Sequence, residues 1–394
     1  MIAPATDRWS ITMGGQTYAT WTRAGLVRDL SEISASFDLE LRDPSRHASF
    51  PWADLMDARA LVTEGLEASL SVDGQVVLKG WVDEIAPRSA DGQAGVTVSG
   101  RDKTCDLIDC AATVEGPWEF RDQTLDKIAA AIVKPFGLAV RVDVDLGDPI
   151  ERLVIEPGET ALAAIEKGAR QRQVLLVSDG LGALVLTRGG KGRAPADLIY
   201  PGGNVIESGG CFSWRERFSA YHVVAQAERA GGRRRKAVKL DATAAPLTGG
   251  GEGGGASVAE HELAGVTIAA TATDDQVTRY RPLVAPAATQ LTAKAAQDQA
   301  DWMMRTARAA AIKIEHAVRG YGWRPNELAL VRDDFQQVHR VLLIAGVAME
   351  YGDFGAVTRL RLTGPEAFDV EPEGSRTQDH KAASKPLDKT AQNL

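Results

Sequence analysis

The sequence predicts an α+β protein with a β domain over residues 1–105, a small α/β insert over 106–203 and a second β domain over 204–370. Three successive patterns along the chain predict this order. Short alternating runs broken by Gly and Asp fill residues 7–101, helical spacing of apolar residues appears after Cys110, and strand-like runs then return. One long helix is expected inside the second β domain.

The first β domain is predicted from its hairpin signals. Gly14-Gly15 lies between two strand-like runs in "WSITMGGQTYATW", and Asp73-Gly74 lies between two more in "ASLSVDGQVVLKGWVDEI". The run "ISASFDLEL" alternates apolar and polar residues, as a half-buried strand does. Five or six short strands with tight turns favour a small antiparallel barrel or sandwich.

The α/β insert is predicted from two helical runs and a hairpin. Thr124 and Thr160 stand as N-caps before the apolar stripes of "TLDKIAAAIVKPFG" and "TALAAIEKGARQR", and Gly137 follows the end of the first helix. The run "LAVRVDV" between them reads as a strand. A final hairpin, "VLLVSDGLGALVLTR", turns near Asp179–Gly182.

The second β domain is interrupted by a helix and a loop, and a tail follows it. A helix is expected over about 289–311, because its apolar residues follow helical spacing. The segment 247–257 is too Gly-rich to pack and predicts a flexible loop, and the polar residues 371–394 predict a disordered tail. The expected strands lie in "FSAYHVVAQAE", "KAVKLDATA", "ELALVRD", "HRVLLIAGVAMEY" and "AVTRLRLTG".

Composition excludes several classes of protein. The net charge of -8 disfavours general nucleic-acid binding, which needs a basic face. The longest apolar run, Val341–Met349, is far shorter than the ~20 residues of a membrane span, and no signal peptide is visible at the start. Three cysteines in 394 residues fit a reducing compartment.

Two of these cysteines lie in the stretch "SGRDKTCDLIDC". Cys105 and Cys110 would lie about 140° apart on a helix or about 17 Å apart on a strand, so they do not form a disulfide with each other. Cys211 has no neighbouring His to complete a zinc site. We interpret them as structural thiols; a metal site, a redox role or an intermolecular disulfide is the less favoured alternative.

No common catalytic or cofactor motif is present. The six histidines form no metal-ligand pair, no G-x-S-x-G elbow occurs, and "GGGEGGG" lacks the Lys-Ser/Thr of a phosphate-binding loop. The cluster Arg233–Lys236 could contact phosphate or an acidic surface, but a solvated loop or subunit contact is favoured. We therefore expect no catalytic residues, no cofactor and no metal.

Four stretches, taken together, resemble one family. They are "GWVDEI", "VSGRDKTCDLIDCAA", "RFSAYHVVAQA" and "TDDQVTRYRPLV". In this order, and with the helix in "TAKAAQDQADWMMR" and the ending "TRLRLTGPEAF", they resemble the late-control-D-like baseplate hub family of Mu-type contractile-tailed phages. The resemblance spans about residues 8–370, and "GRDKTxDLIDC" is its most specific motif.

The resemblance implies a homotrimeric ring that joins the hexameric tail tube to a trimeric central spike. Each chain would bring two small antiparallel β-barrel domains separated by the insert, so that three chains present six barrels to a six-fold tube. Such a protein is assembled in the host cytoplasm, resides in the virion tail baseplate, supports tail assembly and genome delivery, and meets nucleic acid only in the lumen.

The stretches that carry the resemblance supply candidate structural or interface residues. Arg101 and Asp102, at the end of a predicted strand, are expected to tie the first β domain to the insert. The full set is Trp81, Asp83, Arg101, Asp102, Lys103, Asp106, Asp109, Arg217, Tyr221, Arg279 and Arg281.

Two rival functions remain. The chain could be the hub of a related contractile injection particle, such as a tailocin or a secretion system. Less favoured is a hub that also cleaves peptidoglycan, since no segment is spare enough to hold a lysozyme-like insert.

Overall fold

The computed structural model describes residues 9–18, 21–42, 63–90, 93–114, 116, 118–226, 266–286, 293–352 and 355–371. The predicted Gly-rich loop, the basic cluster Arg233–Lys236, the strand expected at Lys236–Ala244 and the tail from residue 372 lie outside these residues. The chain divides into two compact units. Unit 1 contains the described residues up to Arg217 and from Trp302 onward, and unit 2 contains those from Phe218 to Asp301.

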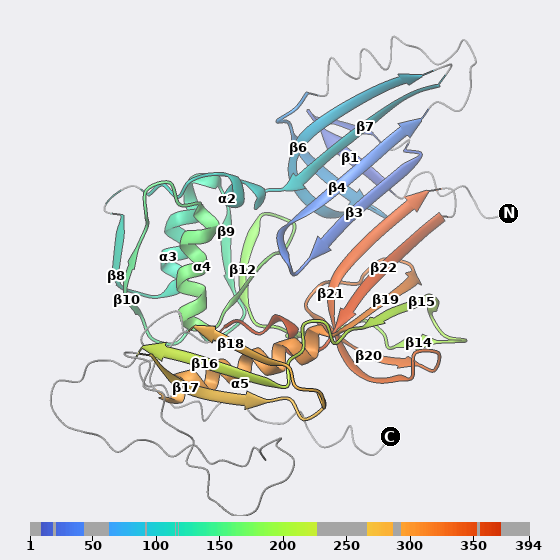
Figure 1. The fold of residues 1–394 in the computed structure, drawn as a ribbon. Helices are drawn as coiled ribbons and strands as arrows, with labels where there is room; N and C mark the ends of the chain where they lie inside the picture. Colours follow the sequence, from blue (N-terminus) through green and yellow to red (C-terminus); the bar gives the residue numbers. More distant parts are fainter. Residues whose placement is uncertain are drawn as a thin grey trace, which may run out of the picture. The chain divides into compact units, whose positions relative to one another are not determined.

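The first β region of unit 1 is an antiparallel sheet in the order β3-β4-β7-β6-β5-β1-β2 (Figure 1). Apolar and polar residues alternate along β4, so one face of the strand is buried. Ala35, Phe37 and Leu39 point into the core, while Asp38 lies on the opposite face. Its strands are β1 (Trp9–Met13), β2 (Gln16–Tyr18), β3 (Arg23–Asp29), β4 (Glu32–Arg42), β5 (Glu67–Val72), β6 (Gln75–Ala90) and β7 (Gln93–Asp102).

The second β region of unit 1 has the order β15-β19-β22-β21-β20, with β13 and β14 pairing in parallel with β20. Its strands are β13 (Gly192–Arg193), β14 (Leu198–Tyr200), β15 (Val205–Phe212), β19 (Ile312–Arg319), β20 (Glu327–Asp333), β21 (Val338–Gly352) and β22 (Gly355–Thr363). The short helix η2 (Pro365–Phe368) follows β22.

The two β regions are joined into one 14-stranded sheet by antiparallel pairing of β21 with β3. This pairing runs from Gly346 opposite Asp29 to Tyr351 opposite Ala24. The outer edge of β3 is therefore occupied by β21 and not by β1 or β2. Within the described residues the strand pairing forms an open path, and the predicted closed barrels are not confirmed.

The two β regions repeat the same arrangement of strands. The order β3-β4-β7-β6-β5 matches β15-β19-β22-β21-β20 position by position, and every pairing along both paths is antiparallel. The corresponding long strands β6 and β21 contain 16 and 15 residues. Each has a register irregularity against its hairpin partner, between Val82 and Glu84 in β6 and between Ile344 and Gly346 in β21.

One hydrophobic core serves both β regions. Leu26, Leu39 and Leu70 of the first region and Ile344 and Leu360 of the second belong to the same buried cluster. Burying a side chain of this size contributes roughly 1.5–3 kcal/mol, so the two regions stabilise each other as one folding unit.

The insert has its own core, made by two helices and two small sheets. Thr160 caps α4 by accepting a hydrogen bond from the Ala163 N–H (3.2 Å), and the predicted hairpin is β11–β12. Two strands that the sequence did not indicate, β8 and β10, pair with each other. The elements are α2 (Cys105–Asp109), β8 (Glu119–Gln123), α3 (Leu125–Val133), η1 (Lys134–Phe136), β9 (Ala139–Val142), β10 (Ile150–Val154), α4 (Ala161–Arg172), β11 (Leu175–Ser178) and β12 (Ala183–Thr187).

Unit 2 is a three-stranded sheet in the order β17-β16-β18. β16 pairs antiparallel with β17 and parallel with β18. The strands are β16 (Ala220–Gln226), β17 (Val266–Thr273) and β18 (Pro282–Pro286), and the predicted long helix is α5 (Ala293–Ala310), which continues from unit 2 into unit 1. No helix in the described part of the chain is long and apolar enough to cross a membrane.

The shared core makes a first prediction. Leu39→Ala removes a fully buried side chain and should lower the free energy of unfolding by about 2–5 kcal/mol. Val76→Ala, at a position 42% exposed on β6, is the control and should change it by less than about 1 kcal/mol. Urea denaturation followed by fluorescence measures both, and equal losses would contradict the assigned core.

Candidate functional site

The most strongly built polar site lies where β7 ends and α2 begins. Asp102 is completely buried. Its carboxylate accepts hydrogen bonds from the Ala35 N–H (2.9 Å), the Ser34 hydroxyl (3.1 Å) and the Thr104 N–H (2.8 Å). A buried charge is tolerated when hydrogen bonds surround it in this way. Asp102 thereby fixes the turn into α2 against the neighbouring strand β4.

Arg101 and Lys103, on either side of Asp102, form ion pairs at the surface. Arg101 Nε lies 2.7 Å from Asp83 Oδ2, and its Nη2 lies 2.7 Å from Asp109 Oδ2. The hydrogen bonds that Arg101 donates to Asp109 and then to Asp83 raise the pKa of Arg101, and the bond that Asp109 accepts lowers the pKa of Asp109. Lys103 Nζ lies 2.6 Å from Glu67 Oε1. These pairs connect β5, β6, β7 and α2.

Trp81 and Asp106 add a second connection between the first β region and α2. The indole Nε1 of Trp81 donates a hydrogen bond to Asp106 Oδ2 (3.1 Å), and Lys103 Nζ lies 5.4 Å above the indole ring. Cys105 is buried beside them, and desolvation followed by the charge of Asp106 raises its pKa to about 12. The thiol is therefore protonated and unreactive at neutral pH.

The backbone ties the same corner to the insert. The Lys79 N–H donates to the carbonyl of Gly180 in the β11–β12 turn (2.7 Å), and the Lys103 N–H donates to the carbonyl of Lys79 (3.1 Å). The structure thus brings together seven of the eleven candidate residues, namely Trp81, Asp83, Arg101, Asp102, Lys103, Asp106 and Asp109.

The remaining candidates lie elsewhere. Arg217 is buried in unit 1, with its guanidinium 5.5 Å above the ring of Trp214. In unit 2, the hydroxyl of buried Tyr221 accepts a hydrogen bond from the Phe218 N–H (3.1 Å), and Arg281 lies 5.3 Å above the Phe218 ring.

Arg279 is different from these three, because it is exposed in the turn that precedes β18. The residues from Arg217 onward therefore belong to local structure in two different units and do not join the cluster at Asp102.

Sequence reasoning missed a buried cluster formed by Ser208, His316 and Asp333. The Ser208 hydroxyl and His316 Nε2 (2.9 Å) both hydrogen-bond Asp333 Oδ2. Because both groups bind the carboxylate and not each other, this is not the arrangement of a catalytic triad. The three residues are far apart in the sequence, so no local signal could have found them.

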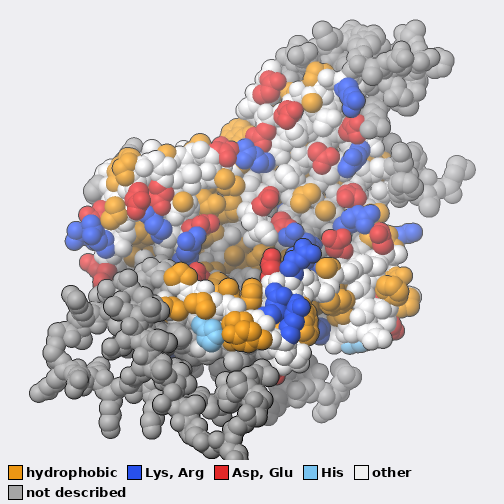
Figure 2. All heavy atoms as spheres, in the orientation of Figure 1, with side chains coloured by type: hydrophobic (Ala, Val, Ile, Leu, Met, Phe, Trp, Pro, Cys, Tyr) orange, Lys and Arg blue, Asp and Glu red, His pale blue; other side chains and the backbone are white. Residues whose placement is uncertain are grey.

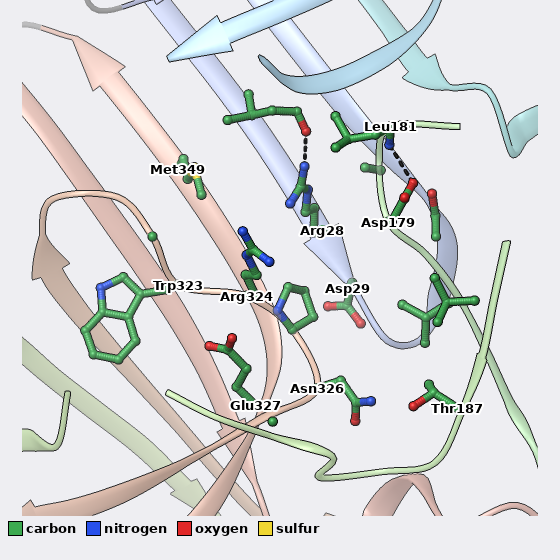
Figure 3. Close-up of a pocket in the computed structure, with 18 of the residues that line it drawn as sticks. Arg28, Asp29, Asp179, Leu181, Thr187, Trp323, Arg324, Asn326, Glu327 and Met349 are labelled. Atoms are coloured by element: carbon green, nitrogen blue, oxygen red, sulfur yellow. Dashed lines mark hydrogen bonds between the residues drawn. The ribbon is translucent and has the colours of Figure 1, made fainter. Parts of the chain in front are cut away.

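A second missed feature is a cavity of about 570 Å³ between the two β regions and the insert, lined by both charged and apolar side chains (Figure 3). Arg28 donates a hydrogen bond to the carbonyl of Val77, and burial lowers its pKa. Glu327 lines the same cavity, and burial raises the pKa of its carboxyl group. In Figure 3 the Arg28 guanidinium points toward the carbonyl oxygen that it hydrogen-bonds, marked by the dashed line.

The surface carries charges of both signs. On the face drawn in Figure 2, acidic and basic side chains are interspersed over the first β region instead of forming a field of one sign. Among the described residues, no three His, Cys, Asp or Glu side chains are grouped as a metal site. The three cysteines are free thiols.

Removal of the Asp102 carboxylate should be far more damaging than removal of a surface partner. Asp102→Ala leaves the buried Ala35 and Thr104 N–H groups unpaired and should cost about 3 kcal/mol or more of unfolding free energy. Asp109→Ala breaks an exposed ion pair and should cost no more than about 1 kcal/mol. Chemical denaturation compares the two; similar losses would contradict the structural role of Asp102.

The buried cluster at His316 predicts acid sensitivity. Burial lowers the pKa of His316 below its ordinary value of 6.5. For Asp333, burial alone raises the pKa, but hydrogen bonds from Ser208, Gln336 and His316 lower it overall. Both groups therefore bind fewer protons in the folded protein than in the unfolded chain. The stability that they contribute is present above the unfolded pKa and is lost as pH falls through the folded pKa.

We therefore expect the melting temperature to fall between pH 7 and pH 5. His316→Gln should cost about 1–3 kcal/mol at pH 7, because it disturbs a buried hydrogen bond, and should flatten the fall. Thermal melts across this range test the assignment, and an unchanged slope in the variant would refute it.

Comparisons with known proteins agree with one another. Residues 9–102 match the family "Mu phage baseplate assembly protein GpP-like, N-terminal", and residues 104–188 match "Baseplate hub protein gp44-like, second domain". The baseplate hub protein gp44 of Escherichia phage Mu is 29% identical over 373 residues, which cover 92% of this chain and 89% of gp44.

Two solved structures are similar over nearly the whole chain. The 43 kDa tail protein of prophage MuSo2 from Shewanella oneidensis has a TM-score of 0.74 and 30% identity, covering 93% of this chain and 99% of its own. The tail protein from Neisseria meningitidis MC58 shares the fold with a TM-score of 0.68 and 20% identity, covering 92% and 98%. The chain belongs to the family of baseplate hub proteins of Mu-type phage tails.

Proposed function

We propose that three copies of this hub form a ring on the tail axis, with a hexameric tail tube on one side and a trimeric central spike on the other. As a baseplate hub the protein is a structural part of the virion tail. The proposal concerns the oligomeric state and the partners. The ring supports tail assembly and serves as the passage for the genome.

The repeated strand order is the observation that carries this proposal. β3-β4-β7-β6-β5 and β15-β19-β22-β21-β20 are two similar β regions in one chain. Three chains therefore supply six similar β regions, which is the number that a six-fold tube requires. In this proposal the two regions take the place of the two β-barrel domains that the family resemblance implies, although the described strands of each region form an open path.

The cluster around Asp102 has a mechanical role in this proposal. Arg101 and Asp102 hold the first β region to the insert, and the ion pairs of Lys103 and Arg101 close the same corner. A hub transmits force between tube and spike, so a rigid joint at this place is useful. We propose no enzymatic activity, since the buried polar clusters of the described residues bind their own backbone and side chains.

The runner-up function is a hub of another contractile injection particle, such as a tailocin or a secretion system. The same trimer would serve in that particle, and only the neighbours differ. A particle purified with this protein and assayed for packaged DNA distinguishes the two.

Mass measurement of the purified full-length protein tests the proposal. We expect a homotrimer, three times the 42.1 kDa of the chain, that co-purifies with the spike and tail tube proteins of the same particle. A stable monomer that binds neither partner would overturn the ring.

A further inference from the structure

Two strand edges of unit 1 are left open at opposite ends of the same path. β15 ends the sheet, so the side of β15 that faces away from β19 pairs with no described strand. β6 pairs with β5 only as far as Trp81, and beyond Val82 its second half pairs with β7 alone among the strands that the structure describes. Unpaired edges of this kind are templates for another strand.

The edge strand β15 and its flank carry large apolar side chains in solvent. Ile206 is 46% exposed, Phe212 is 54% exposed and Trp214 is 44% exposed. An apolar group of this kind on an open edge is a mark of an interaction surface. The second half of β6 is also accessible, with Ala86 and Arg88 both exposed.

The chain itself shows how these two edges fit together. In the repeated order, β6 corresponds to β21 and β15 corresponds to β3, and β21 pairs with β3 within the chain. Two landmarks set the alignment. The register irregularities align Glu84 with Gly346. Gly25 of β3 pairs with Asp38, and Gly209 of β15 pairs with Glu315 in the corresponding place. Gly25 therefore corresponds to Gly209.

We propose that β15 of one copy adds antiparallel to the second half of β6 of the next copy, repeating the pairing of β3 with β21. This inference rests on the proposed ring and names its subunit contact. Ala348 pairs with Val27 inside the chain. The corresponding residues of the repeat are Ala86 and Cys211, which would therefore lie opposite each other between copies. Ile85 then lies opposite Phe212, and Arg88 lies opposite Gly209.

The faces of the two strands agree with this register. Ile85 lies on the core side of β6, opposite Val98, and Phe212 lies on the core side of β15, in line with buried Ile314. The contact would cover the exposed ring of Phe212. On the other face, Arg88 would meet Glu315 across the bare backbone of Gly209, and both charged side chains are exposed in the single chain.

Pro87 sets a limit on the hydrogen bonding. It takes the position of Met349 and has no N–H. The ladder between copies therefore lacks one donor that the ladder between β21 and β3 has. Proline is accepted on an edge strand, and the remaining positions keep their backbone donors.

Cys211 makes the register testable, because it is an exposed free thiol. Leu30 and Ala345 are the next pair after Asp29 and Gly346 in the ladder of β3 and β21, and the Leu30 N–H donates to the Ala345 carbonyl (2.8 Å). Since hydrogen-bonded positions alternate, Val27–Ala348 is a non-hydrogen-bonded pair, with Cα atoms about 4.5 Å apart. That spacing permits a disulfide. Because Ala86 and Cys211 correspond to Ala348 and Val27, the proposed register gives them the same Cα spacing.

The experiment uses the full-length protein with Cys110→Ser, which removes the other exposed thiol. Ala86→Cys in this background should form disulfides between copies in a glutathione buffer, seen as covalent trimers on a non-reducing gel. We expect at least about tenfold more cross-linked chains than with Ala86→Cys/Cys211→Ser. Val27→Cys/Ala348→Cys is the matched control and should link within one chain.

A second pair of variants tests the charges. Arg88→Glu should weaken the trimer by about three- to tenfold in its dissociation constant, and adding Glu315→Arg should restore it. Mass measurement under reducing conditions gives the trimer fraction of each variant, and a double variant no more trimeric than Arg88→Glu alone would contradict this charge pair.

The outcomes separate the two proposals. A trimer that does not link through positions 86 and 211, while the internal control links, overturns the strand pairing and leaves the ring intact. A protein that is monomeric with or without the substitutions overturns both.

Discussion

The fold depends on the antiparallel pairing of β21 with β3, because this contact joins the two β regions. The paired residues, from Gly346 with Asp29 to Tyr351 with Ala24, are more than 300 positions apart in the sequence. It turns two separate sheets into one sheet over a shared core. An ion pair between Arg361 and Asp29 crosses the joint above Gly346. A Cβ atom at Gly346 would lie 2.7 Å from the Asp29 carboxylate, so a larger residue at this position would force the Asp29 side chain to shift.

Buried carboxylates fix the ends of strands in both β regions. Asp102 closes β7 by accepting bonds from β4 and from the turn that follows. Asp333 closes β20 by accepting bonds from β15 and β19. Each carboxylate is fully buried and multiply hydrogen-bonded, which makes these strand ends rigid and sensitive to substitution.

Local features could be predicted from the sequence. Gly14-Gly15 and Asp73-Gly74 form the expected hairpins, since both turns need positive φ angles that suit these residues. α3 and α4 follow Thr124 and Thr160 as predicted, although only Thr160 makes a capping hydrogen bond. The polar stretch after β7 was expected as a strand end and turn, and it also contains the short helix α2.

Contacts between distant segments could not be predicted. β21 pairs with the edge of β3, although β15 offers a second open edge among the described strands. No sequence pattern specifies which of the two edges it pairs with. The burial of Arg28 and the Ser208–His316–Asp333 cluster depend on the same long-range packing. Of the candidate site, the motif from Arg101 to Asp109 was found because it is one continuous stretch that carries the family resemblance. Its partners Ser34, Ala35 and Glu67 come from other strands and were missed.

The connections between corresponding strands differ greatly in length. β3 passes to β4 through a short turn, whereas β15 passes to β19 through residues 213–311, which include all of unit 2. The insert likewise follows β7, while β22 is followed only by η2 among the described residues. A ring of three copies would therefore repeat its sheet six times but each of these additions three times. In the proposed ring, these unequal connections would reduce the six-fold repeat of the sheets to the three-fold symmetry of the trimer.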